Sequence, residues 1–419
     1  MNAIAGPPIL DALRAALAFE ADGEAVGNLT VGRGRVRERH IRAALVENRV
    51  ASGALGRAEC ERLAEMIRIA AAERSPLVLF LDSAGAKLSE GLGALGSFRT
   101  LYRAALDAEL AGAPFVAVLG RNCYGGASML AQLASRRIFA ADTRLAMSGP
   151  SIVAAAAGVD VLDEVFRAMS DATMSAAARA KASPANAVWT PSDDLGGWLA
   201  ESLRSAEDAP AALRARHDSL ARRLENPSRQ APTEALHRRD LERVYPDGHE
   251  AREDQGFVEG RGMVEGAAEA FVGLVGKSAL GAARAWRFAE AIWRHTQAPP
   301  ERLAVFLDCA SHSARLEDEK IVLSEFIADM GCALAALVAR GTRVRLVILG
   351  KASGGVYVAL AAPVAEVSSV YGADIQVLPG AAVAAILGST HESVPTFAEY
   401  RSAGVAESEI KLGLVPGAP

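Results

Sequence analysis

The sequence contains the same pattern twice, and this duplication restricts the chain to folds that can be built from two similar units. The first copy includes LVLFLDSAGAKLSEG and later RNCYGGASML, and the second includes LAVFLDCASHSARLEDE and later GKASGGVYVAL. Asp82 corresponds to Asp308 in this pairing. The step from Gly126 to Pro150 equals the step from Gly355 to Pro379, at 24 residues in each copy. A repeat of this length indicates a duplicated domain rather than a solenoid of short units.

Composition supports large packed cores. The chain has 419 residues, of which 51% are hydrophobic and 23% charged, as expected for two or three globular domains. A net charge of −5 gives no reason to expect a nucleic-acid partner. The N-terminal segment lacks the pattern of a signal peptide, and no uncharged apolar run is long enough to span a bilayer. We therefore expect a cytoplasmic protein without a membrane partner.

The four cysteines are not arranged for zinc or dithiol chemistry. Cys60, Cys123, Cys309 and Cys332 form no C-x-x-C pair, so neither a zinc ribbon nor a redox dithiol is expected. Cys123 and Cys309 lie beside the loops that carry the duplicated motifs, and each could serve either as a nucleophile or in packing. We interpret both as small packing residues, because neither has a catalytic partner nearby in the sequence.

Helical and strand patterns alternate along both copies, which predicts an α/β fold. Helical spacing of apolar residues predicts a helix over 57–73, and LVLFLD and FVAVLG are typical of fully buried strands. Between the copies lies a polar, arginine-rich stretch with several prolines. We predict a first domain over residues 1–200, a charged and solvated helical linker over 201–255, and a second domain over 256–419.

Each copy places two glycines directly after a buried strand and at the start of a helix. Backbone N–H groups at a helix N-terminus lack intrahelical partners, and the helix dipole favours negative charge there. Gly125 and Gly126 in the first copy, and Gly354 and Gly355 in the second, therefore predict two backbone oxyanion holes. The alternative is that these glycines only allow tight packing of helix on strand. Occurrence at matching places in both copies favours the oxyanion holes.

The loop after the first buried strand differs between the copies. In the first copy it is made of small residues around Gly85 and Ala86, which would expose further backbone donors. In the second copy it is more polar and contains His312, one of only seven histidines. We consider His312 a candidate proton donor, although a histidine in a surface loop is an equally reasonable interpretation.

Taken together, these motifs resemble the carboxyltransferase branch of the crotonase superfamily, and in detail the β and γ subunits of biotin-independent malonate decarboxylase fused in one chain. The β-like motifs are Cys123, Tyr124, Gly125, Gly126 and Ala127, followed by Ser148, Gly149 and Pro150. The γ-like motif runs over residues 350–356. The resemblance covers roughly residues 24–170 and 257–405, and it implies two tandem crotonase-like (ββα superhelix) domains. This chain departs from the family pattern at Ala84 and Lys87.

The resemblance implies decarboxylation of a malonyl thioester to the acetyl thioester through an enolate. The first hole would hold the thioester oxygen, and the second would face the departing carboxylate. The residues assigned to catalysis on this basis are Gly85, Ala86, Tyr124, Gly125, Gly126, His312, Gly354, Gly355 and Val356. Those assigned to substrate binding are Lys87, Ala127, Ser128, Gly149, Pro150, Lys351 and Ser353. No metal or other cofactor is expected, because the substrate would arrive on the phosphopantetheine of an acyl carrier protein or on coenzyme A.

Partner and reaction remain open at this point. An acidic acyl carrier protein could bind the arginine-rich stretches at 33–42, including Arg35, Arg37 and Arg39, or at 212–252. The family implies a homo-oligomer, expected to be a dimer, and the two holes could meet within one chain or across two. The alternatives are a biotin-dependent acyl-CoA carboxyltransferase, a non-catalytic scaffold that binds a carrier protein, and a crotonase-type hydratase or hydrolase.

Overall fold

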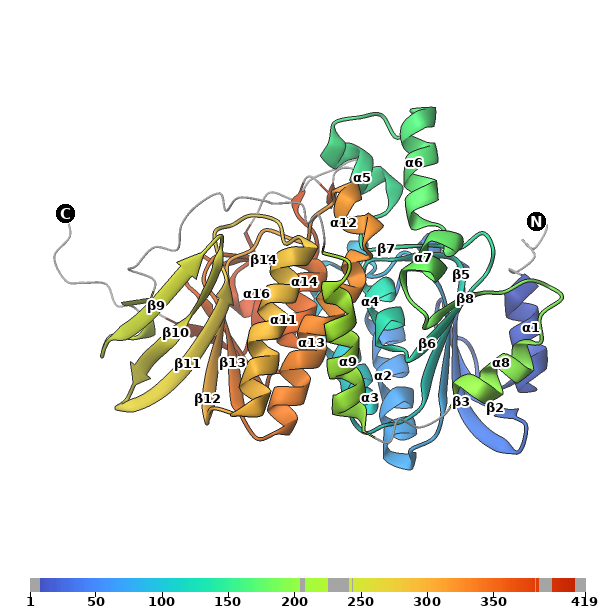
Figure 1. Ribbon diagram of the computed structural model, residues 1–419, viewed down its shortest axis with the longest axis horizontal. Coiled ribbons are helices and arrows are strands. Elements are labelled where there is room, and N and C mark those ends of the chain that lie inside the picture. Colours follow the sequence, from blue (N-terminus) through green and yellow to red (C-terminus); the bar gives the residue numbers. More distant parts are fainter. Residues whose placement is uncertain are drawn as a thin grey trace.

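The computed structural model describes residues 8–203, 208–224, 241–242, 244–380, 382–383 and 394–410. It consists of two α/β halves, each with one large sheet of mostly parallel strands, and helices of both halves lie between the two sheets (Figure 1). The predicted α/β class with two tandem units is confirmed. None of the helices in the described part of the chain is both long enough and apolar enough to cross a membrane.

The first half is built on a sheet with strand order β1-β2-β3-β4-β5-β6-β8, with β7 pairing with β5. Its strands are β1 (Glu20–Ala21), β2 (Leu29–Val36), β3 (Arg39–Val46), β4 (Leu77–Ser83), β5 (Phe115–Tyr124), β6 (Arg136–Phe139), β7 (Arg144–Ala146) and β8 (Asn186–Val188). Its helices are α1 (Pro8–Leu17), α2 (Arg57–Glu73), α3 (Gly91–Leu110), α4 (Gly125–Leu133), α5 (Pro150–Ala157), α6 (Glu164–Met174), α7 (Ala176–Ala182) and α8 (Leu195–Ser202), with short 3-10 turns at Ala51–Gly53 and Leu88–Glu90.

The second half has a sheet of order β17-β15-β13-β12-β11-β10-β9 and a separate pair, β14 with β16. Its strands are β9 (His249–Asp254), β10 (Phe257–Val264), β11 (Ala267–Leu274), β12 (Arg302–Leu307), β13 (Arg343–Ile348), β14 (Lys351–Ser353), β15 (Glu366–Val370), β16 (Asp374–Gln376) and β17 (Ser408–Ile410). Its helices are α11 (Ala282–Gln297), α12 (Leu316–Lys320), α13 (Leu323–Ala339), α14 (Gly354–Ala361) and α16 (Phe397–Ser402), while α9 (Ala209–Ala221) lies between the halves in sequence.

The two halves share one continuous apolar core. Helix α13 is buried at every position from Leu323 to Leu337, as expected for a mostly apolar helix at the centre of the molecule (Figure 1). Its buried carboxylates, Glu325 and Asp329, are paired with residues in α9 and directly after it. The same cluster contains residues of α3 and α4 from the first half and of α14 from the second. Burial of apolar surface therefore holds the halves together as well as each half separately.

The charged segment between the halves is packed rather than solvated where the structure describes it. Helix α9 buries Leu213, His217 and Leu220, and Arg223 donates a hydrogen bond of 2.7 Å to the buried Glu325 of α13. Strand β9, also in this segment, pairs with β10 and extends the second sheet. The predicted helical character agrees with α9, but the predicted solvation is wrong for the buried side of this helix. The residues of β9 after His249 are exposed, as predicted. Residues 204–207, 225–240 and 243 of the predicted linker lie outside the described residues.

Apolar burial alone does not explain how α9 is held, because His217 forms polar contacts in the interior. Its Nδ1 lies 2.6 Å from Asp329 Oδ2, its Nε2 lies 2.9 Å from Glu290 Oε2, and its ring stacks on Trp286 with centroids 5.2 Å apart. Burial by itself lowers the pKa of His217, but the two carboxylates outweigh burial and raise it. In its protonated form the ring ties α9 to the second half through both carboxylates.

We predict that His217→Asn lowers the free energy of unfolding by about 2 kcal/mol at pH 6, because a charge-assisted buried contact is lost. Since the pKa of His217 is raised in the folded protein, this stabilisation is complete below the unfolded value near 6.5 and declines as the pH rises through the folded value. Urea unfolding between pH 6 and 9 would measure this, with the exposed His40→Asn as control. A deficit that grows with pH would contradict the assignment.

Candidate active site

The two glycine pairs line one cavity within a single chain. This cavity has a volume of about 770 Å³, and its wall includes Gly125 and Gly126 from the first half and Gly354, Gly355 and His312 from the second. We call the two pairs the first and second glycine turns. Each turn begins a helix, α4 or α14, directly after a strand. The described structure therefore brings the two predicted holes together without a second copy of the chain.

An aspartate fixes the approach to each turn in the same way. Asp82 Oδ1 accepts a hydrogen bond of 3.1 Å from the N–H of Asn122, and Asp308 Oδ1 accepts one of 2.8 Å from the N–H of Lys351. Asp82 lies near the end of β4 and Asp308 directly follows β12, and each donor belongs to the strand that leads into the glycine turn. The duplicated aspartates thus fix the strand before each glycine turn relative to the neighbouring buried strand.

The loops before the turns also occupy equivalent places, although their sequences differ. Ala86 forms a parallel bridge with Leu55, and His312 forms the same kind of bridge with Leu280. The backbone bonds on either side agree: Leu55 N–H donates to Gly85 O, and Leu280 N–H donates to Ser311 O. His312 therefore stands in the second half where Ala86 stands in the first.

Two backbone donors remain for a ligand at the first turn. The N–H of Gly125 already donates to the carbonyl of Met147 at 3.2 Å, so this amide is used within the protein. The N–H of Gly126 lies in the first turn of α4, where backbone N–H groups have no partner within the helix. The N–H of Ala86 donates no hydrogen bond to another of the described residues. Gly85 has φ +94°, and a Cβ there would lie 3.0 Å from the nitrogen of Gly126. Only glycine at position 85 leaves that donor open.

The second turn lies against methionines of the first half. A Cβ at Gly355 would come within 2.6 Å of Met129 Sδ and 2.7 Å of Met147 Cε, so the lack of a side chain permits this close approach. Ser353 supports the turn, because its Oγ donates a hydrogen bond of 2.6 Å to the carbonyl of Ala310. Val356 is buried and is not among the residues that line the cavity.

His312 lines the cavity and is only 7% exposed, so the alternative of a surface-loop histidine is wrong. Its Nε2 lies 3.1 Å from Ser148 Oγ of the first half, and its Nδ1 lies 3.4 Å from Ser311 Oγ. Burial lowers the pKa of His312 to about 4, so the imidazole is neutral at pH 7. A neutral imidazole has one donor and one acceptor nitrogen, and it can therefore pass a proton to or from the serine hydroxyl.

Tyr124, the other candidate proton donor, also lines the cavity and is half-buried at the end of β5. Burial raises the pKa of Tyr124 to about 12, so its hydroxyl keeps its proton at neutral pH. The structure thus places both candidates at the cavity.

The residues assigned to substrate binding divide into those at the cavity and those beneath it. Lys87, Gly149 and Pro150 line it, and Lys87 Nζ forms an ion pair of 3.0 Å with Glu90. Ser128 is buried behind the first turn, where its Oγ donates 2.7 Å to the carbonyl of Gly125.

Three further assigned residues do not reach the cavity. Ala127 is buried, Lys351 has an exposed side chain, and Ser353 supports the second turn from behind; none of the three is a lining residue.

Both cysteines beside the motifs are buried thiols. Burial raises the pKa of Cys123, and it raises the pKa of Cys309 to about 11. Cys309 Sγ lies 3.2 Å from the carbonyl of Ser278. Because nucleophilic cysteines need a lowered pKa, these properties support a packing role for both.

Sequence reasoning missed two parts of the site. In the sequence Ser148 stands out only as part of a motif. Its contact with His312 could not be predicted, because the two residues are 164 positions apart. Helices α5 and α6, which project beside α12 in Figure 1, supply the apolar lining residues Ile152 and Phe166, and the segment between them supplies Val161. Leu162 and Val165 next to them are exposed apolar side chains, which rarely cluster at a surface without a reason, but their exposure could not be predicted from the sequence.

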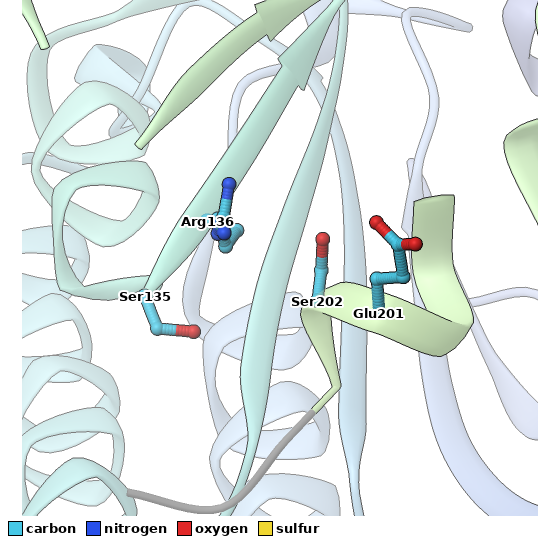
Figure 2. A pocket seen from close by; sticks show the side chains of 4 residues that line it. All are labelled: Ser135, Arg136, Glu201 and Ser202. Carbon is cyan, nitrogen blue, oxygen red and sulfur yellow. The ribbon is translucent and has the colours of Figure 1, made fainter. Parts of the chain in front are cut away.

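A second hollow lies elsewhere, at the edge of the first sheet (Figure 2). It is lined by Ser135, Arg136, Glu201 and Ser202 and has a volume of about 480 Å³. Arg136 begins β6 and Ser202 ends α8, so this hollow contains none of the duplicated motifs. We assign the chemistry to the cavity between the glycine turns.

The predicted carrier-protein surfaces lie away from this cavity or are engaged within the chain. The hairpin with Arg35, Arg37 and Arg39 joins β2 to β3, and β3 runs parallel to β4, which ends at the cavity loop. At about 3.3 Å per residue, the hairpin is on the order of 20 Å from that loop. In the other stretch, Arg214 pairs with Glu290 at 3.1 Å. Carrier binding at either surface stays a prediction.

Residues 12–173 match the sequence model of the carboxyl transferase domain. This stretch covers β2 to α5 and includes the first glycine turn, so the first half carries the features of that domain. Within the described residues, no group of three or more histidine, cysteine, aspartate or glutamate side chains is placed to hold a metal ion.

Relatives with this domain are carboxyltransferase subunits. The chain is 28% identical over 134 residues to the methylmalonyl-CoA carboxyltransferase 12S subunit of Propionibacterium freudenreichii subsp. shermanii, covering 32% of this chain and 25% of that protein. It is 32% identical over 182 residues to the acetyl-coenzyme A carboxylase carboxyl transferase subunit beta 1 of Roseiflexus castenholzii, covering 43% of this chain and 58% of that protein. The chain thus spans less than two thirds of either relative.

Among solved structures, the Pseudomonas malonate decarboxylase MdcD-MdcE hetero-dimer aligns with a TM-score of 0.42 and 23% identity. The alignment covers 52% of this chain and 95% of that one.

We predict that the His312 imidazole stays neutral from pH 8 down to about pH 5, because burial lowers its pKa to about 4. The unfolded chain takes up this proton near pH 6.5, so His312 costs stability as the pH falls from about 6.5 towards 4. Nitrogen NMR of labelled histidine, assigned with His312→Gln, would follow the titration. A His312 signal that titrates above pH 6 would contradict the buried, neutral ring.

Proposed function

We propose that this protein removes CO2 from a malonyl thioester and releases the acetyl thioester. The observation that carries the proposal is the shared cavity, in which backbone donors of the first turn, the second turn and the buried His312 meet. Each half supplies part of the site. This arrangement suits a substrate with two polar ends, the thioester and the carboxylate, because each end can bind a different half. The acyl group would be carried by coenzyme A or by the phosphopantetheine of an acyl carrier protein.

The first turn would hold the thioester oxygen. Loss of CO2 breaks the bond between the methylene carbon and the carboxylate carbon, and its electron pair forms an enolate with negative charge on that oxygen. The N–H groups of Gly126 and Ala86 can donate to it. Such donors act more strongly on the enolate than on the neutral carbonyl, and losing one costs roughly 3 kcal/mol in comparable holes.

The second turn would orient the carboxylate. The N-terminus of α14 offers backbone N–H groups to an anion, while Met129 and Met147 present apolar surface beside it. Apolar surroundings disfavour the localised negative charge of the carboxylate. Loss of CO2, which moves this charge into the enolate, is therefore favoured.

The methylene carbon must finally receive a proton. Ser148 and the neutral His312 are in contact at the cavity and can deliver one, which water then replaces. These steps need neither a metal nor a redox cofactor. A homodimer and a cytoplasmic location remain part of the proposal.

The second candidate is a biotin-dependent carboxyltransferase, which the names of the relatives favour. The same two turns would then hold an acyl thioester and the ureido group of biotin. A scaffold that only binds a carrier protein is the third candidate. The three differ in what happens to a malonyl thioester without biotin.

We expect the purified chain to convert malonyl-CoA or malonyl-carrier protein to the acetyl form without biotin, as measured by mass spectrometry. Conversion that requires added biotin would support the carboxyltransferase instead. Binding of the thioester without conversion under either condition would leave only the scaffold and would overturn the decarboxylase proposal.

We predict that Gly85→Ala lowers kcat by about 100-fold or more, because the added Cβ would cover the N–H of Gly126. Gly91→Ala is a matched control: this glycine also has a positive φ, of +52°, but nothing lies within 4 Å of a Cβ there. Both variants carry backbone strain, and Gly85→Ala is expected to unfold at the lower temperature because its Cβ would also lie 2.8 Å from the carbonyl oxygen of Tyr124. Activity is therefore compared at a temperature where both variants are folded. Equal loss of activity in both variants would show that strain, rather than the donor, is responsible.

A further inference from the structure

Glu319 is a buried carboxylate of the second half that contacts the backbone of the first. It lies in α12 with 0% exposure, its Oε1 accepts a hydrogen bond of 2.9 Å from the N–H of Ser148, and its Oε2 accepts one of 3.3 Å from the N–H of Met147. Arg179 is itself 1% exposed. Its guanidinium lies 3.7 Å from Glu319 Oε2 and donates a hydrogen bond of 2.6 Å to the backbone carbonyl of Glu319. Both carboxylate oxygens are therefore engaged across the junction between the halves.

The two residues that Glu319 holds, Met147 and Ser148, contact the first glycine turn, the second glycine turn and His312. Met147 accepts the N–H of Gly125 through its carbonyl, and its side chain lies against Gly355 of the second turn. Ser148 contacts His312 through its hydroxyl. A shift of this dipeptide would move the first turn, the second turn and the serine–histidine contact relative to one another.

The helix-capping contact that the two copies share is made by Asp318, the neighbour of Glu319, and not by Glu319 itself. Asp318 accepts the N–H of Ala282 at the start of α11 at 2.9 Å, as Glu90 accepts the N–H of Arg57 at the start of α2 at 2.7 Å. Asp318 is therefore the counterpart of Glu90. The contact of Glu319 with the other half is an addition found in the second copy.

We propose that Glu319 is a positioning residue, whose carboxylate sets the backbone of Met147 and Ser148 and thereby aligns the two glycine turns and the Ser148–His312 contact. This inference rests on the proposed function only for its kinetic readout. In this proposal the contact of Glu319 with Met147 and Ser148 keeps the two halves in a productive arrangement within one chain.

The environment of Glu319 makes this alignment depend on pH. The groups that face it are Arg179, Asp318 and Tyr124. Burial raises the pKa of Glu319 to about 7, against the opposing effects of Arg179 and the two backbone donors. Protonation places a donor on one oxygen, which then no longer accepts a backbone N–H. Activity is therefore expected to fall as the pH decreases through about 7.

The test compares Glu319→Gln with Glu325→Gln. Glu325 is a matched control, since it is also buried at the junction and accepts a hydrogen bond of 2.7 Å from Arg223. Its carboxylate pairs with Arg223 and Arg137 rather than with the backbone of Met147 and Ser148. We expect Glu319→Gln to lower kcat by about 10- to 100-fold with KM changed less than about threefold, and to lose the acidic decline near pH 7. Glu325→Gln is expected to lower thermal stability while keeping kcat within about twofold and the wild-type pH profile.

Amide hydrogen exchange provides a readout that does not depend on the reaction. Peptides covering Met147 and Ser148 should lose protection in Glu319→Gln and keep it in Glu325→Gln. If the wild-type chain shows no decarboxylation, the proposed function fails while the exchange result still decides the role of Glu319. Unchanged exchange at these two amides, or the same kinetic change in both variants, would overturn the inference.

Discussion

The site depends on backbone N–H groups that remain unpaired at the start of a helix. A strand that passes directly into a helix leaves such donors at its end, and glycine allows another group to approach them. Here each half forms this arrangement once, with an aspartate at the end of the neighbouring buried strand accepting a backbone N–H of the strand that leads into the turn. Since neither donor is a side chain, this part of the site tolerates change elsewhere in the sequence but not in the glycines that surround it.

The duplicated units have become different where they meet. Ala86 and His312 occupy equivalent places, so one half presents a bare backbone donor where the other presents an imidazole. Asp318 retains the helix-capping role of Glu90, whereas Glu319 beside it reaches into the other half. At these equivalent places the first half therefore presents small residues and backbone, and the second half presents polar side chains.

The sequence was sufficient for the fold class and for the glycine turns, because buried strands and glycine pairs leave local patterns. The bounds of α2 agree with the predicted helix over 57–73, and the predicted buried strands LVLFLD and FVAVLG lie in β4 and β5. Contacts between distant segments could not be predicted in this way. The pairing of Ser148 with His312, and of Glu319 with the dipeptide before Gly149, depends on how the halves pack. The packed state of α9 was missed because its charges pair inside the protein, although composition alone is typical of a solvated surface.

The attachment of α9 to the second half by His217, and to α13 by Arg223, has a consequence for assembly. In a site made from separate subunits, the fraction of complete sites depends on protein concentration. Here both turns belong to one chain, so each meets the other at an effective concentration set by the connecting segment rather than by the solution. Dilution should therefore leave the cavity intact.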